Sequence, residues 1–242
     1  MKKALGILGG MGPQATLDLQ QKILDFTDAG CDQDHIRVYV DNHTQIPDRI
    51  GAVLRNTSSP TPDLQESLNK LTAIGAECVV MPCISAHIFL PQLSVPPQII
   101  FLDMLHVAAE SCKLQFPSLK AGVLCTEAVA QSGLLTRYLK SRSIPFLYPN
   151  EEEQRLLGRL IFNVKAKTCM NPVSESLNNI ATQMKSRGAG YFLLACTELP
   201  LINQYKPLPY PCVDSTAELA KAAVKGCGYE LRREFLIKGK LA

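Results

Sequence analysis

The sequence predicts an α/β protein with two similar lobes, each built on a parallel sheet. Short apolar strand patterns alternate with helix patterns along all 242 residues, which is typical of parallel sheets with helices on both faces. Segments of the first half also recur in the second half at a nearly constant distance. The apolar fraction of 46% is ordinary for a globular protein, which excludes broad disorder.

The first lobe is expected to begin with a strand, a turn and a helix. An apolar run over residues 3–10 ends in glycines, as a buried strand followed by a tight turn does. Pro13 suits the first turn of a helix, and apolar residues at helical spacing follow over 14–27. Similar patterns predict a strand at 36–42, a helix at 62–75 and strands at 78–83 and 98–103.

The second half repeats this order. A helix pattern at residues 104–114 leads to residues 121–141, which predict a strand, a turn and a helix. Two helices, a strand and a closing strand with its helix are expected at 151–167, 174–190, 191–196 and 210–228. Strands separated by helices of this length again favour parallel pairing.

Internal repetition indicates that the two lobes are homologous. The segment "GAECVVMPC", which ends at Cys83, resembles the later segment "GAGYFLLAC", which ends at Cys196. Two further pairs align in the same order and at almost the same separation, Gly6 with Gly122 and Asp103 with Asp214. Chance similarity between buried strands does not explain three separations that agree so closely.

The repeat suggests a division into lobes and a place for a site. We expect one lobe to comprise residues 1–103 plus 208–242, with the last strand and helix returning to it, and the other to comprise 104–207. Ligands of open α/β sheets bind at the carboxyl ends of the strands. Cys83 and Cys196 both end a strand, so a pseudo-twofold axis would set their thiols opposite each other across the cleft.

The nine cysteines do not predict a disulfide framework, because no secretory signal is expected. No C-x-x-C pair occurs and the four histidines are scattered, so we expect no metal site. No apolar run approaches the roughly 20 residues of a membrane span. We expect a cytoplasmic protein that binds neither membrane nor nucleic acid, with the basic run "ELRREFLIKGK" at 230–240 as a solvated tail.

Two opposed thiols suit one class of reaction. Inverting a stereocentre by proton transfer needs a base on one face of the carbon and an acid on the other. The unperturbed pKa of a thiol is about 8.5, so one thiolate and one thiol can coexist near neutral pH. A single cysteine is more often a core residue, but the pairing at equivalent repeat positions favours a catalytic role for Cys83 and Cys196.

Several motifs together resemble the aspartate/glutamate racemase family, whose members racemise amino acids without a cofactor. The motifs are "GILGGMGPQAT", "DQDHI", "QIPDR", "VVMPCISAH", "QSGL", the "VKA" that follows "NEEEQR", and "CTELPL", and they extend over nearly the whole chain. The resemblance implies two Rossmann-like domains with the active site between them. It also implies an isomerase that acts on an acidic amino acid with two thiols, without pyridoxal phosphate or metal, and a homodimer.

The resemblance assigns roles to eight residues. Cys83 and Cys196 are the acid/base pair, and the substrate-binding residues are Arg49, Ser85, Lys165, Thr197, Glu198 and Met11. Cations are needed there because loss of the α-proton builds negative charge beside a carboxylate, and an arginine can bind a carboxylate through two hydrogen bonds. Without the resemblance, Arg49 also fits a solvated loop arginine and Lys165 a surface lysine.

The chain departs from the family pattern at two places. Ile84 stands where the family has asparagine, and Ala128 and Val129 fall on its Gly-Thr pair. We expect each change to remove a polar contact, at about 1–3 kcal/mol each. Two alternatives therefore stay open, a related racemase or isomerase with an altered substrate and a non-catalytic binder of a small carboxylate. Retention of both cysteines opposes the binder, since binding alone needs no thiol.

A nicotinamide-dependent oxidoreductase is a further alternative. The stretch "GMGPQA" fits the G-x-G-x-x-A dinucleotide fingerprint, and Asp41 ends the next strand as a ribose ligand does. However, Asp41 lies further beyond Ala15 than the roughly 20 residues that the fingerprint requires. Pro13 also stiffens the turn where a pyrophosphate would approach. We rank this function below a tight turn that lines a small-molecule cleft.

Overall fold

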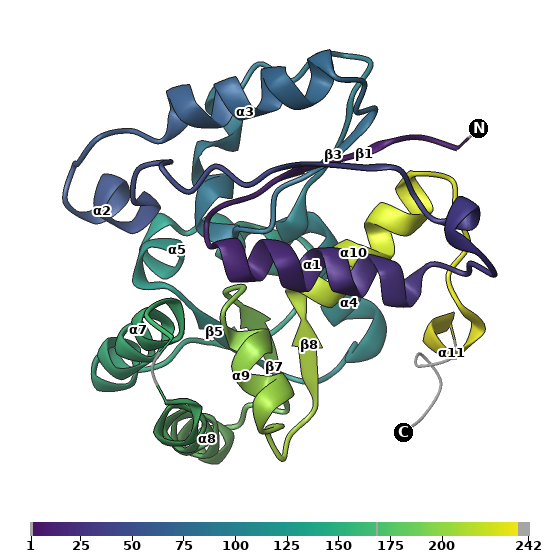
Figure 1. The fold of residues 1–242 in the computed structure, drawn as a ribbon. Helices are drawn as coiled ribbons and strands as arrows, with labels where there is room; N and C mark the ends of the chain where they lie inside the picture. Colours follow the sequence, from purple (N-terminus) through teal and green to yellow (C-terminus); the bar gives the residue numbers. More distant parts are fainter. Residues whose placement is uncertain (1, 168, 237–242) are drawn as a thin grey trace.

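The computed structural model describes residues 2–167 and 169–236 and contains two four-stranded parallel sheets (Figure 1). The first has the order β2-β1-β3-β4, with β1 Leu5–Leu8, β2 Val38–Asp41, β3 Cys78–Val80 and β4 Ile100–Leu102. The second has the order β6-β5-β7-β8, with β5 Ala121–Cys125, β6 Phe146–Leu147, β7 Tyr191–Ala195 and β8 Cys212–Asp214. The predicted α/β fold with two similar parallel sheets is confirmed.

Helices cover both sheets. The α-helices are α1 Pro13–Phe26, α2 Arg49–Leu54, α3 Thr61–Ala73, α4 Met104–Gln115, α5 Glu127–Ser132, α6 Leu134–Ser141, α7 Glu151–Lys165, α8 Met170–Ser186, α9 Leu199–Tyr205, α10 Ser215–Gly226 and α11 Arg233–Leu236. Two 3-10 helices are η1 Asp32–Asp34 and η2 Ile84–Gln92. No helix among the described residues is long and apolar enough to cross a membrane.

Strand register confirms the repeat that the sequence predicts. Gly6 pairs with Val79 in the first sheet, and Gly122 pairs with Phe192 in the second. The sequence repeat aligns these same residues, Gly6 with Gly122 and Val79 with Phe192. A Cβ added to Gly6 would lie 2.9 Å from the Ala76 side chain, and one added to Gly122 would lie 2.6 Å from the Phe192 ring. Both glycines thus permit a close approach at equivalent places.

Alternate side chains of each strand enter different layers, because successive residues point to opposite faces of a sheet. In β7, Leu193 joins a central core, while Phe192 and Leu194 pack on the opposite side in a core that also contains residues of α7 and α8. The corresponding outer core of the first sheet includes residues of α3. In Figure 1, α3 and the pair α7 and α8 accordingly lie on opposite outer sides of the molecule.

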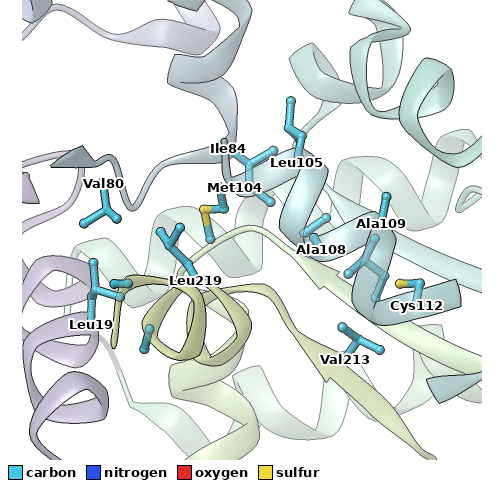
Figure 2. Packing of buried hydrophobic residues seen from close by; sticks show 14 of the residues in the cluster. Leu19, Val80, Ile84, Met104, Leu105, Ala108, Ala109, Cys112, Val213 and Leu219 are labelled. Atoms are coloured by element: carbon cyan, nitrogen blue, oxygen red, sulfur yellow. The ribbon is translucent and has the colours of Figure 1, made fainter. Parts of the chain in front are cut away.

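The central core lies between the two sheets and is built around α4 and α10 (Figure 2). Helix α10 contacts α1, α4 and strands of both sheets. Leu19 of α1, Met104 of α4 and Leu219 of α10 are buried in one cluster that also contains residues of β1 and β7. This shared layer fixes the two sheets relative to each other.

The last strand does not return to the first lobe as expected. Strand β8 pairs with β7 and so belongs to the second sheet, whereas α10, which follows it, packs against α1 and α4. The expected placement of residues 208–242 is therefore wrong for the strand. An apolar pattern predicts that a strand is buried but does not specify its neighbour, which explains the error.

The C-terminal run is also more ordered than a solvated tail. Leu231 is buried and forms an antiparallel bridge with Thr27. The ring of Phe235 lies against that of Phe26, with 4.5 Å between the ring centres. The remainder of this run, residues 237–240, lies outside the described residues.

The turn after β1 requires glycine. Gly10 has a φ of +91°, and a Cβ there would lie 2.4 Å from the backbone of His43. The amide of Gly10 donates a hydrogen bond of 2.9 Å to the hydroxyl of Thr16. This turn brings the following residues to the carboxyl edge of the first sheet.

We predict that Gly122→Ala lowers the free energy of unfolding by about 1–3 kcal/mol, because the added methyl group meets the fully buried Phe192 ring. Gly158→Ala is the control, since a Cβ in that helix meets no atom within 4 Å and alanine favours a helix by up to about 1 kcal/mol. Urea unfolding followed by circular dichroism measures both. An unchanged midpoint for Gly122→Ala would contradict the close packing.

Candidate active site

A small cavity of about 10 Å³ lies between the carboxyl edges of the two sheets. The loops after β1, β2 and β3 and those after β5 and β7 all contribute to it. Its lining residues are Met11, Asp48, Arg49, Ile50, Cys83, Ile84, Ser85, Thr126, Lys165, Cys196, Thr197 and Glu198. All eight residues that the sequence singles out as site residues are among them, so residues from both halves of the chain share one cavity.

The two cysteines come from equivalent strand ends. Cys83 lies three residues after β3 and Cys196 directly after β7, and they are only 6% and 7% exposed. Each begins a turn, because Ala86 donates its amide to the Cys83 carbonyl and Leu199 donates its amide to the Cys196 carbonyl. Both thiols are thus buried at the cavity, one from each sheet.

Glu198 is a buried carboxylate next to the second thiol. The thiol of Cys196 donates to Oε2 of Glu198 at 3.0 Å, and Glu198 is 4% exposed. Burial raises the pKa of Cys196 well above its usual range, and the negative charge of Glu198 raises it further, whereas Lys165 opposes the shift. Cys196 is therefore held as a neutral thiol, ready to donate a proton.

Lys165 supplies positive charge to the cavity. Its Nζ lies 3.5 Å from Oε1 of Glu198. Burial acts to lower the pKa of Lys165, but the acidic groups around it, Glu198 first, outweigh burial, so its pKa is raised. The ammonium group is charged, and Lys165 lines the same cavity as both cysteines although its side chain is 38% exposed.

Arg49 is held rigidly by backbone carbonyls. Its Nη1 donates to the carbonyls of Ile46 and Pro47 at 3.1 and 2.9 Å, and its Nη2 donates to that of Met11 at 3.4 Å. The buried Nε has no hydrogen-bond partner among the described residues. A buried donor without a partner costs about 1–3 kcal/mol, which makes this atom a candidate donor to a ligand.

A hydrogen bond joins the two lobes across the cavity. The hydroxyl of Ser85, after β3, lies 3.0 Å from that of Thr126, after β5. Thr126 also caps α5 by accepting a hydrogen bond from the amide of Val129. Thr126 was not predicted as a site residue, although the alignment of Gly6 with Gly122 makes it the counterpart of Gly10 in the first site loop.

The two departures from the family pattern have different outcomes. Ile84 lines the cavity, but it is only 3% exposed and belongs to the central core together with Leu105 (Figure 2). Ala128 and Val129 are fully or almost fully buried and are not among the lining residues. Of the two polar contacts expected to be lost from one pocket, only the one at Ile84 concerns a residue that lines this cavity.

The cavity adjoins two larger ones. A groove of about 1090 Å³ shares Asp48, Ile50, Thr126 and Lys165 with it. On the other side, a cavity of about 350 Å³ shares Arg49, Lys165 and Glu198 and includes the glycine-rich turn. A Cβ at Gly12 would lie 3.6 Å from Glu198. The turn therefore lines the small-molecule site, as its simpler interpretation predicts.

Comparison with known proteins identifies amino-acid racemases as relatives of this chain. The family model for Asp/Glu/hydantoin racemase matches residues 8–223. Aspartate racemase of Picrophilus torridus has a structure with a TM-score of 0.86 and 32% identity, covering 98% of this chain and 100% of that chain. The broad specificity amino-acid racemase RacX of Bacillus subtilis is 26% identical, covering 91% of this chain and 96% of RacX.

The fold similarity extends to more distant structures. Glutamate racemase isoform RacE1 of Bacillus anthracis has a TM-score of 0.60 at 16% identity, with 93% of this chain and 83% of that chain covered. At this identity the similarity shows the fold alone. Its two-lobed architecture agrees with the two sheets described above.

We predict opposite effects of two substitutions on the reactivity of Cys196. Glu198→Gln removes a negative charge that raises the pKa of Cys196, so that pKa falls and the thiolate fraction at a given pH rises. Lys165→Met removes the opposing positive charge and raises the pKa further. The rate of iodoacetamide alkylation at Cys196, followed by peptide mass spectrometry across neutral and alkaline pH, measures the shift.

The exposed Cys31 and Cys169 serve as internal references in this measurement. Their alkylation profiles should stay unchanged in both variants. A Cys196 profile that stays unchanged in Glu198→Gln would show that the carboxylate does not control this thiol.

Proposed function

The chain belongs to the Asp/Glu/hydantoin racemase family, and on that premise we propose that it inverts amino acids at the α-carbon by proton transfer between Cys83 and Cys196. Family membership makes it an isomerase that acts on amino acids. The two-thiol mechanism is our proposal, and so are the preference for aspartate or glutamate and the absence of a cofactor.

One observation carries the proposal. A buried thiol from each sheet lines the same cavity, and the charged side chain of Lys165 lines it as well. A base and an acid on opposite faces of one carbon are what inversion by proton transfer requires. Buried structural cysteines would have no need of a shared cation or of a cavity between the lobes.

The protonation state suggests how a turnover begins. Cys196 is a thiol hydrogen-bonded to Glu198, so it is the acid in the direction that starts from this state. Cys83 would then act as the thiolate that removes the α-proton, and its electron pair would form the S–H bond. The electrons of the broken C–H bond delocalise into the α-carboxylate, and the carbon then takes the proton of Cys196 on its other face.

Two cations support the charge that develops in this step. Arg49 would bind the α-carboxylate through its unpaired Nε–H, and Lys165 would stabilise the thiolates and the developing negative charge. Donors that are already fixed in place stabilise such charge without reorganising. The three carbonyls that hold Arg49 give it this fixed geometry.

The substrate is proposed from the relatives. The Picrophilus torridus relative is an aspartate racemase and RacX is a broad specificity amino-acid racemase, so we propose an acidic amino acid, with aspartate first. Ile84 at the cavity favours the second candidate, a racemase or isomerase of the same mechanism with a less polar substrate. Non-catalytic binding of a small carboxylate is the remaining alternative. Location in the cytoplasm and assembly as a homodimer stay predictions.

We predict that the wild-type protein incorporates deuterium at the α-carbon of both enantiomers of its substrate in heavy water and inverts them. Cys83→Ala and Cys196→Ala should each lower turnover by about 10³-fold or more, since each removes one of two essential proton carriers. Chiral chromatography and mass spectrometry of an amino-acid panel measure inversion and exchange. Binding of a carboxylate without either signal would establish the non-catalytic alternative, and full turnover in either variant would exclude two thiols.

We predict that Arg49→Ala raises the KM about 10- to 100-fold, because a charge-assisted hydrogen bond to the substrate carboxylate is lost. Arg37→Ala is the matched control, since Arg37 is an exposed arginine of the first lobe that lines none of these cavities. Initial-rate kinetics on both enantiomers provide the comparison. Equal KM values for the two variants would assign Arg49 a purely structural role in its loop.

A further inference from the structure

His87 closes the motif "VVMPCISAH" and does not line the cavity. It lies on η2, shortly after Cys83, and its side chain is fully buried. Burial lowers its pKa, an effect that the nearby Asp103 and the Cys83 carbonyl only partly oppose. The ring is therefore neutral at neutral pH and buried beside a residue of the active site.

Both ring nitrogens of His87 have a backbone partner, and these partners fix the tautomer. The amide of Met104 donates to Nε2 at 3.2 Å, so Nε2 carries the lone pair. Nδ1 therefore carries the proton and donates it to the Cys83 carbonyl at 2.9 Å. Neither bond would survive with a phenyl ring of similar size in this place.

The Met104 end of this link is anchored in the central layer. Met104 begins α4, and Asp103 caps that helix by accepting hydrogen bonds from the amides of Leu105 and His106. Asp103 also accepts a hydrogen bond from the hydroxyl of Tyr138 in α6. His87 thus connects the backbone of Cys83 with the helix that packs between the two sheets.

The second thiol has no such link. Extending the alignment of Cys83 with Cys196 places Pro200 at the position equivalent to His87, and proline has no side-chain hydrogen bond to offer. Cys196 is instead bound directly by Glu198, through its thiol. The two lobes therefore hold their cysteines by different means.

We propose that His87 is a positioning residue for Cys83. Its neutral imidazole fastens the Cys83 backbone to the start of α4 and so holds this thiol, and not that of Cys196, at the correct place in the cavity. The inference rests on the proposed function, because it assumes that the position of the Cys83 thiol matters for proton transfer.

This role can be tested by measuring whether deuterium exchange slows for one enantiomer and not for the other. In the two-thiol mechanism each enantiomer loses its α-proton to a different cysteine, and Cys83→Ala identifies the enantiomer that depends on Cys83. His87→Phe should slow deuterium incorporation into that enantiomer by about 10²-fold, the effect of a misplacement on the order of 1 Å. Exchange without inversion of the other enantiomer, which loses its α-proton to Cys196, should stay close to the wild-type rate, whereas inversion should slow in both directions because it uses both thiols.

Two variants control for ring size and for folding. His43→Phe makes the same change at a half-buried histidine of the first lobe that contacts Ser67 and lines none of the three cavities, and it should leave both exchange rates unchanged. His87→Gln keeps one donor and one acceptor and should recover most of the lost rate. Thermal melting confirms that each variant is folded, and His87→Asn replaces His87→Phe if the latter is not.

The outcomes separate this inference from the proposed function. If the wild-type protein exchanges neither enantiomer, the proposed function fails. Alkylation still tests His87 in that event, because the iodoacetamide rate of Cys83 relative to Cys196 should change several-fold in His87→Phe. If the wild-type protein exchanges both enantiomers and His87→Phe slows them equally, or slows neither, His87 does not position Cys83 and the inference is overturned.

Discussion

The packing of α4 and α10 between the two sheets is the constraint on which the site depends. Each sheet alone presents one cysteine at its carboxyl edge, and a single thiol has no partner for inversion. The buried layer that includes Met104 and Leu219 fixes the distance and angle between the sheets, so that both edges meet at one cavity. The hydrogen bond between Ser85 and Thr126 joins the edges at that point. The packing of the apolar core thus determines where the polar residues of the cavity lie.

Electrostatics then differentiates two thiols that the repeat makes equivalent. Glu198 lies beside Cys196 and favours its protonated form, and Lys165 balances the charge of that carboxylate. A buried negative charge without such a cation would be unfavourable, since burial penalises an unpaired charge. The repeat therefore supplies a symmetric frame, and residues that are not repeated, Glu198 and Lys165 among them, give the two thiols different electrostatic surroundings.

Much of this arrangement is predictable from the sequence, because strands that are buried on both faces leave continuous apolar runs and a repeat of these runs reveals two lobes. That pattern also predicts that Cys83 and Cys196 follow equivalent strands, although β3 ends at Val80, earlier than the predicted strand over 78–83. Helices α2 and α9 escaped prediction because they are only 6 and 7 residues long, too short for a helical period to show. The pairing of β8 with β7 also escaped, since apolar runs do not encode strand neighbours. Thr126 was missed because a polar residue in a loop acquires its role only when the other lobe lies opposite.

The crossing of the chain after β8 has a consequence for how the molecule behaves as a whole. Strand β8 completes one sheet, and the helix that continues from it covers the other. Neither half of the chain can be cut away without exposing apolar surface on the remainder, because both halves contribute to the central core. We expect such a body to melt in one cooperative event, and relative motion of its halves during a catalytic cycle to be limited to what a continuous shared interior allows.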